Sequence, residues 1–253
     1  MNCTHLRGGH ILPLIQENCP NLTFLDVSGT NIRTIHIEKL QAGCPKLKEL
    51  FLVNLVLNST PTCKTLNDEK KPSGFPQLEN LGLPCGYIGV DHRRTDKFLY
   101  RILWSSHNLR VLDIRGPNRF SPEGLRRLPV ISLEQLYLTS NASTFSKMAA
   151  IVEKWHHSLE VLDLSLNKDI EDEHVELLRN FGMPKLHTLD LSSTSITADG
   201  VRSVLNGCPN LTDLNLVSCR GVPRGIKRRH QGESLRNLPQ RMMDIEQESA
   251  ESE

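Results

Sequence analysis

Residues 196–219 read Ile-Thr-Ala-Asp-Gly-Val-Arg-Ser-Val-Leu-Asn-Gly-Cys-Pro-Asn-Leu-Thr-Asp-Leu-Asn-Leu-Val-Ser-Cys, a helix pattern followed by a strand pattern. In the first half, the Thr197 hydroxyl can cap the start of a helix. Val201 and Val204 are three residues apart and give that helix an apolar stripe. Gly207 stands where a left-handed stop is expected. The first half therefore predicts a helix that ends near Gly207.

The second half of the stretch has apolar residues at a different spacing. Leu214 and Leu216 are two residues apart, which places both side chains on one face of a strand. Leu211 lies three residues earlier and is expected to pack at the entry to the strand. The intervening Asp213 and Asn215 then point to the opposite face, which we expect to be exposed to solvent.

The strand pattern recurs along the chain. Leu-x-x-Leu-x-Leu, with Val or Ile allowed at the last position, begins at Leu22, Leu47, Leu78, Leu109, Leu133, Leu159, Leu186 and Leu211. Five of the seven intervals are 24–27 residues and two are 31 residues. A leucine-rich repeat has a period of roughly 20–29 residues. The sequence therefore predicts an α/β leucine-rich-repeat solenoid, with a curved parallel sheet on the concave side and helices on the convex side.

The repeats divide the chain into an array and a tail. We expect residues 1–222 to form about eight repeats, with a polar, turn-rich insert at 58–74. Residues 10–18 read as the helical half of a preceding repeat, so we expect the array to be incomplete at its N-terminus. Residues 223–253 are charged, and we expect a disordered tail there. Its basic run at 224–230 is either a nuclear signal or a solvated face that helps to cap the last repeat.

Composition excludes several classes of protein. The net charge of +1 gives no support for nucleic acid or a membrane as the partner. The sequence has neither a secretory signal nor an apolar run long enough to cross a bilayer, so we expect a cytoplasmic or nuclear protein. Seven cysteines without a Cys-x-x-Cys pair indicate reduced thiols. We interpret four of them as small buried apolar residues: Cys19, Cys44, Cys208 and Cys219.

The candidate functional site is the concave face. The residue between the two strand leucines is, in order, Asp26, Phe51, Gly82, Asp113, Tyr137, Asp163, Asp190 and Asn215. Aromatic residues on a solvated face commonly anchor interfaces, and a row of aspartates favours a basic partner. The alternative is structural, because the aspartates can serve neighbouring strands and the aromatics can be packed. Apart from Gly82, we take these residues as the predicted site for a protein partner.

No catalytic, cofactor or metal motif accompanies this face. We therefore expect a protein without enzymatic activity, cofactor or metal, and we expect it to be a monomer.

The repeats resemble the cysteine-containing leucine-rich repeats of F-box proteins. The resemblance is carried by residues 196–219, by Gly-Cys-Pro-Lys-Leu at 43–47, and by Cys-Arg-Gly-Val-Pro-Arg-Gly-Ile-Lys-Arg at 219–228. It implies the substrate-binding region of a Skp1–cullin–F-box (SCF) ubiquitin ligase receptor. The F-box itself, which would bind Skp1 and cullin, has no counterpart in these residues. A stand-alone repeat scaffold, or a decoy isoform without ligase coupling, is the alternative.

Overall fold

The computed structural model describes residues 14–15, 19–29, 37–52, 74–83, 92–116, 120–139 and 145–250. These fall into two compact units, 1–133 and 134–253. The predicted insert at 58–74 and the predicted N-terminal helix at 10–18 lie almost wholly outside the described residues. Within the described part, no helix is both long enough and apolar enough to cross a membrane.

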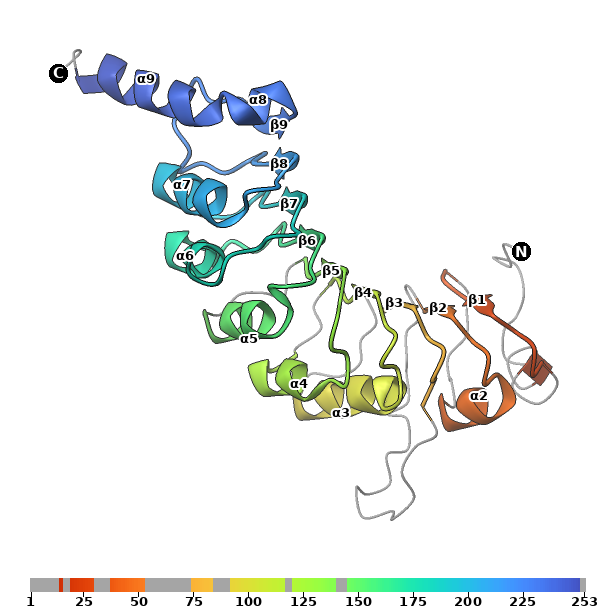
Figure 1. Ribbon diagram of the computed structural model, residues 1–253. Helices are drawn as coiled ribbons and strands as arrows, with labels where there is room; N and C mark the ends of the chain where they lie inside the picture. The colour runs from red at the N-terminus through yellow and green to blue at the C-terminus, as the bar shows by residue number, and fades with distance from the viewer. Residues whose placement is uncertain are drawn as a thin grey trace. The chain divides into compact units, whose positions relative to one another are not determined.

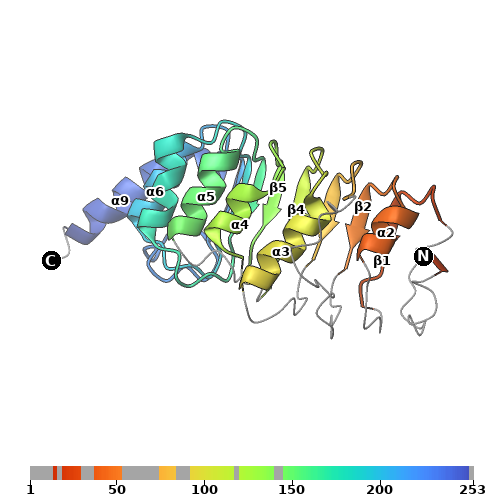
Figure 2. The same ribbon diagram turned by 90° about the horizontal axis from the view of Figure 1, so that it is seen from below.

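The first unit is a set of parallel strands with helices on one side (Figure 2). Its elements are β1 (Phe24–Asp26), α2 (Ile37–Gly43), β2 (Glu49–Phe51), β3 (Asn80–Gly82), α3 (His92–Leu103), β4 (Val111–Asp113) and α4 (Pro122–Arg127). The strands pair in chain order, with Leu25, Leu50, Leu81 and Leu112 in register. All four leucines are buried, so each repeat adds one layer to an aliphatic core.

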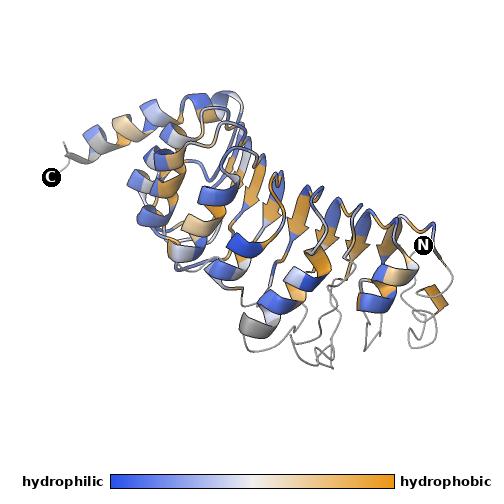
Figure 3. Ribbon diagram, turned by 60° about the horizontal axis from the view of Figure 1, so that its bottom comes forward, coloured by the Kyte–Doolittle hydropathy of each residue, from blue (hydrophilic) through white to orange (hydrophobic). Residues whose placement is uncertain are grey.

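The second unit repeats this arrangement and then departs from it (Figure 1). Its repeats contain β5 (Gln135–Tyr137), α5 (Phe145–Trp155), β6 (Val161–Asp163), α6 (Asp172–Phe181), β7 (Thr188–Asp190), α7 (Ala198–Gly207) and β8 (Asp213–Asn215). The strands from β5 to β8 are parallel and align Leu136, Leu162, Leu189 and Leu214. Apolar residues run along the strands, whereas the helices are mixed in character (Figure 3). The predicted leucine-rich-repeat fold is confirmed in both units.

Two carboxylates join helices of successive repeats in the same way, one in each unit. Asp96 of α3 accepts the backbone N–H of Ser121 at 2.9 Å and its hydroxyl at 2.5 Å. Asp172 of α6 accepts the N–H of Thr197 at 2.8 Å and its hydroxyl at 2.5 Å. Ser121 and Thr197 are the N-caps of α4 and α7, and each lies 25 residues after its aspartate. We call these contacts the aspartate locks.

Two glycines bring α7 close to α6. A Cβ atom added at Gly200 would lie 2.2 Å from the Asp172 carboxylate. A Cβ at Gly207 would lie 2.5 Å from both the Arg179 nitrogen and the Leu178 carbonyl oxygen, which are backbone atoms. The prediction that Gly207 provides a left-handed stop was wrong, because Gly207 is the last residue of α7 and lacks a positive φ. It is required for close helix packing instead.

Gly207→Ala is expected to lower the free energy of unfolding by about 1–3 kcal/mol, the usual cost of overpacking. Helix propensity alone would favour Ala by roughly 0.5–1 kcal/mol, so the sign of the change shows which effect is larger. The measurement is urea denaturation, with Asn206→Ala on the exposed side of α7 as the matched control. A Gly207→Ala chain that is as stable as the control would contradict the close approach of the two helices.

Residues 223–250 of the tail are folded, so the prediction of disorder was wrong for them. β9 (Arg229–Gln231) pairs antiparallel with β8 and is followed by α8 (Glu233–Arg236) and α9 (Leu238–Ala250). The spacing of Leu238, Met242 and Ile245 gives α9 an apolar stripe, and all three are buried. That stripe is hidden in the sequence by the charged residues around it. We call residues 223–250 the C-terminal cap.

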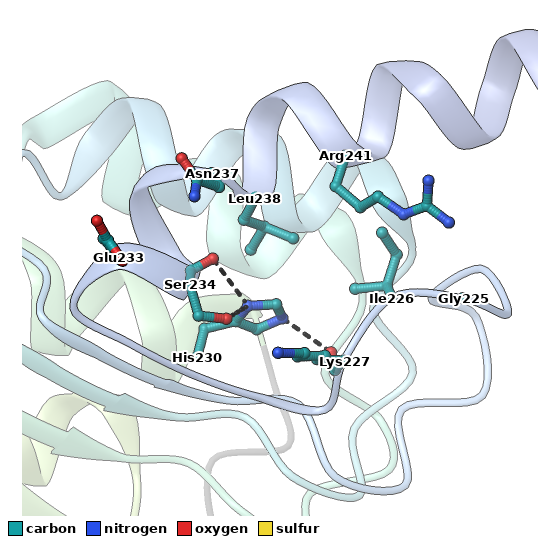
Figure 4. A pocket seen from close by; sticks show the side chains of 9 residues that line it. All are labelled: Gly225, Ile226, Lys227, His230, Glu233, Ser234, Asn237, Leu238 and Arg241. Carbon is teal, nitrogen blue, oxygen red and sulfur yellow. Dashed lines mark hydrogen bonds between the residues drawn. The ribbon is translucent and has the colours of Figure 1, made fainter.

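His230 holds the loop and helix of the cap together (Figure 4). Its ring is buried, with Nε2 2.8 Å from the Lys227 carbonyl oxygen and Nδ1 3.2 Å from the Ser234 hydroxyl. A cavity of about 500 Å³ lies beside the ring, walled by Ile226 and Leu238 among other residues. Both ring nitrogens have partners, so His230 is a structural residue of the cap.

The interpretation of the cysteines as buried core residues holds for three of the four, whereas Cys19 is only partly buried. Cys44, Cys208 and Cys219 are buried, and the Cys219 thiol donates to the Leu191 carbonyl oxygen at 3.0 Å. Burial raises the pKa of the Cys208 thiol to about 12. The pKa of Cys44 is also raised, first by burial and then by the neighbouring Cys19. The thiol form is therefore the stable one in the folded chain.

Cys208 is expected to make stability depend on alkaline pH. Its pKa is 9.0 when exposed and about 12 when folded. Between these two pKa values the thiol ionises in the unfolded chain but stays protonated in the folded one. The free energy of unfolding therefore falls as pH rises from 9.0 to about 12. The measurement is urea denaturation at several alkaline pH values, with Cys208→Ala as control. If both chains lose stability equally with pH, the thiol is not responsible.

Candidate protein-binding face

The candidate binding face consists, in each unit, of the outward residues of the short strands. In most strands the central leucine is buried and its two neighbours are partly exposed. The predicted site residues all stand at the third position of a strand: Asp26, Phe51, Asp113, Tyr137, Asp163, Asp190 and Asn215. The first three belong to the first unit and the other four to the second. Asp26 is exposed and the others are partly buried, so each unit places its own members along one face.

The acidic members of this row close the turn that follows each strand. Asp163 and Asp190 accept the backbone N–H two residues ahead at 2.9 and 2.8 Å. Asp26, Asp113 and Asn215 make the same contact. The next residue along has a positive φ in each of these five repeats: Gly29, Gly116, Leu166, Ser193 and Ser218. These side chains therefore have a local structural role, in which an Asx residue satisfies the backbone of a left-handed turn.

The aspartates differ in whether a second side chain binds their carboxylate oxygens. Both oxygens of Asp113 bind the Arg115 side chain, at 2.9 and 2.6 Å. The second oxygen of Asp190 accepts from the Asn215 amide at 2.7 Å, a contact between neighbouring strands. Asp26 and Asp163 have no such second partner in the described part of the chain. The row is thus less acidic towards a partner than the sequence alone indicates.

The two predicted aromatics are both partly buried. The ring of Phe51 lies 6.0 Å from that of Phe24, centroid to centroid, with the rings tilted by 49°. A Cβ at Gly82 would lie 2.6 Å from the Phe51 ring, so this glycine leaves the space that the ring occupies. In the second unit, the Tyr137 hydroxyl donates to the Gln135 side chain at 3.0 Å. Both aromatics contact residues of the strand face.

The predicted site did not include the first outward position of the strands, although Asp213 at that position of β8 was expected to be exposed. Phe24 is 48% exposed, the most exposed aromatic side chain in the described residues. Glu49 and Val111 occupy the same position in β2 and β4. Strand alternation contains the signal that would have found them, because residues two apart share a face.

The described residues contain no group of three or more His, Cys, Asp or Glu side chains that could hold a metal ion. In each unit, the outward side chains on these short strands include carboxylate groups and an aromatic ring, and the second unit adds the Asn215 amide.

Comparison with known proteins identifies the family. The model of the family "FBD-associated F-box protein At5g56370, LRR repeats" matches residues 125–251, half of the chain. Putative F-box/LRR-repeat protein 9 of Arabidopsis thaliana is 29% identical over 140 residues, covering 53% of this chain and 56% of the relative. Putative F-box/LRR-repeat protein 21 of the same plant is 25% identical over 145 residues, covering 57% and 40%. The chain thus spans about half the length of these relatives.

Among solved structures, the crystal structure of the Rad7 and Elc1 complex in yeast is similar. The similarity has a TM-score of 0.46 and 15% identity, and covers 85% of this chain and 68% of that one. The family model spans the last repeats and the cap, and the names of both relatives likewise combine an F-box with leucine-rich repeats. The chain therefore belongs to the F-box/LRR-repeat family.

Proposed function

We propose that this chain is the target-binding repeat region of an SCF ubiquitin ligase receptor. The observation that carries the proposal is membership of the F-box/LRR-repeat family. The strands of each unit support it, because they present a row of outward side chains. In this reading, the repeats hold a target protein and an F-box outside these residues binds Skp1 and cullin. The ubiquitin chemistry belongs to other subunits, so the chain contributes position rather than catalysis.

The fold holds the outward side chains in fixed positions, which suits this role. Strands of three residues, held by buried leucines on both neighbouring strands, fix the backbone under each outward side chain. A partner therefore meets side chains whose positions are set before binding, which reduces the entropy lost on association. We place this activity in the cytoplasm or the nucleus.

Competition in cells tests the proposal. The chain of 253 residues, expressed in excess beside a full-length receptor of the family, is expected to lengthen the half-life of a target that co-precipitates with it. The chain alone is expected not to retain Skp1. Thr188→Arg places a bulky charge at an outward position of β7 and should abolish the effect. Glu176→Arg makes the same kind of change at an exposed position of α6 and should preserve it.

Two results would count against the ligase role. Direct, saturable binding of purified Skp1 would place the docking surface within the repeats. A target that is captured through β7 but keeps the same half-life, with or without the chain, would favour a stand-alone repeat scaffold.

A further inference from the structure

The face of β1 to β3 carries a pair of aromatic side chains, Phe24, which is exposed, and Phe51, which is partly exposed. Phe24 is 48% exposed and its ring contacts only that of Phe51 among the described rings. Exposed apolar side chains that lie next to each other mark interaction sites more often than isolated exposed apolar side chains do. The pair extends towards β3, because Gly82 leaves room for the Phe51 ring.

Carboxylates stand beside both rings. In the parallel register, Phe24 is opposite Glu49, and Asp26 is opposite Phe51. Neighbouring strands lie about 4.8 Å apart, so each ring has an acidic side chain at the adjacent position. Aromatic and acidic residues thus alternate in a two-by-two pattern across β1 and β2.

Within the described residues, these carboxylates lack a basic partner of the kind that Arg115 provides for Asp113. Asp113 is neutralised by Arg115, but the residue equivalent to Arg115 in the first repeat is Ser28. Ser28 donates its backbone N–H to Asp26 at 2.8 Å and brings no positive charge. The Glu49 side chain makes no hydrogen bond or ion pair with the described residues, although its backbone N–H donates to the Thr23 carbonyl oxygen at 3.0 Å.

The nearby lysines do not supply the missing charge. Lys48 pairs with Glu79 at 2.8 Å, and Lys46 donates to the Asn21 side chain at 2.7 Å. Two carboxylates therefore flank two rings, and none of the described lysine or arginine side chains lies between them.

We propose that this face binds an arginine side chain of a protein partner. A guanidinium is attracted to the face of an aromatic ring and forms strong hydrogen bonds with carboxylates. Its planar shape also allows it to stack on a ring while its N–H groups reach sideways, which an ammonium group cannot do. Phe24 and Phe51 supply the stacking surface, and Asp26 and Glu49 supply the acceptors. That the partner is a ligase target rests on the proposed function.

Nuclear magnetic resonance on the whole isotope-labelled chain tests the site directly. The probe is the peptide Gly-Gly-Arg-Gly-Gly, and its control contains citrulline, which has nearly the same shape as arginine but no charge. The arginine peptide is expected to shift the ring signals of Phe24 and Phe51, and added salt should weaken its binding. The citrulline peptide should shift them much less.

Two variants separate the contributions of ring and charge. Phe51→Leu and Glu49→Gln should each weaken binding of the arginine peptide roughly two- to fivefold, the range for a cation–π or exposed charge contact. Glu123→Gln, an exposed carboxylate on α4 of the same unit, should leave it unchanged. Glu49→Gln keeps the side-chain size, so it reports on binding even if the Phe51 variant folds poorly.

The site is refuted if the arginine peptide does not bind, if citrulline binds equally well, or if Glu49→Gln has no effect. None of these results concerns Skp1 or target turnover, so the proposed ligase role could still hold. Conversely, a chain that binds the arginine peptide but never changes target half-life would refute only the ligase role.

Discussion

Leu189→Ala is expected to lower the free energy of unfolding by about 2–5 kcal/mol, the range for removing a buried leucine side chain. Leu189 is 1% exposed and lies at the centre of β7, between Leu162 and Leu214 of the neighbouring strands. A cavity at this layer cannot be filled from elsewhere, because each repeat contacts only its neighbours. Hydrogen exchange should accelerate in β6 and β8 as well as in β7.

Leu166→Ala is the matched control for this prediction. The same atoms are removed, but Leu166 is 58% exposed, so the free energy of unfolding should change little. The measurement is urea denaturation of both variants, together with exchange rates resolved by residue. Unchanged exchange on both sides of β7 would show that the strand register is wrong.

Removal of residues 223–253 is expected to destabilise the second unit more than any single substitution discussed here. The cap buries Ile226, Leu235, Leu238, Met242 and Ile245, and each buried side chain of this size contributes about 1.5–3 kcal/mol of transfer free energy. Its loss would also expose the backbone edge of β8, which invites aggregation. Thermal denaturation and light scattering would measure both effects.

A shorter truncation distinguishes the contribution of the cap to stability from that of the last three residues. Removing residues 251–253 alone leaves β9, α8 and α9 intact, so the thermal midpoint should be unchanged. If both truncations behave like the full chain, the cap contributes nothing to stability and the repeats are self-sufficient.

The core was predictable from the sequence because one residue type recurs at one spacing. Leu162, Leu189 and Leu214 are buried and in register, as the Leu-x-x-Leu-x-Leu pattern predicts. The caps at Ser121 and Thr197 were also predictable, since a hydroxyl before an apolar-periodic segment has a specific role at a helix start.

The basic run at 224–230 was considered as a face that helps to cap the last repeat, and Arg229 and His230 do lie in β9, which pairs with β8. The two helices of the cap were missed, because they occur once and do not follow the repeat period. Their apolar residues are diluted by charged ones, so composition alone indicated disorder. Gly207 was misinterpreted for a different reason. Glycine serves both as a left-handed stop and as a point of close approach, and only the position of α6 distinguishes the two.

The candidate site was predicted in part. The third strand position was identified correctly as outward, but the aspartates there turned out to hold the following turn. Phe24 and Glu49 lie on the same face and were not included, because the predicted site took only the outward residue between the two strand leucines. Which carboxylates are neutralised depends on residues such as Arg115, and that information is not contained in the repeat pattern.

The aspartate locks make the length of a repeat subject to selection. Each carboxylate meets a helix start 25 residues later, once in each unit. The strand and helix between the two partners are already fixed by their buried side chains. One residue gained or lost between the partners would therefore turn the donating N–H and hydroxyl away from the carboxylate that accepts from them. Insertions and deletions in natural variants should therefore be rare between Asp172 and Thr197. Such length changes should accumulate instead in segments that no lock spans, such as the polar stretch at 58–73.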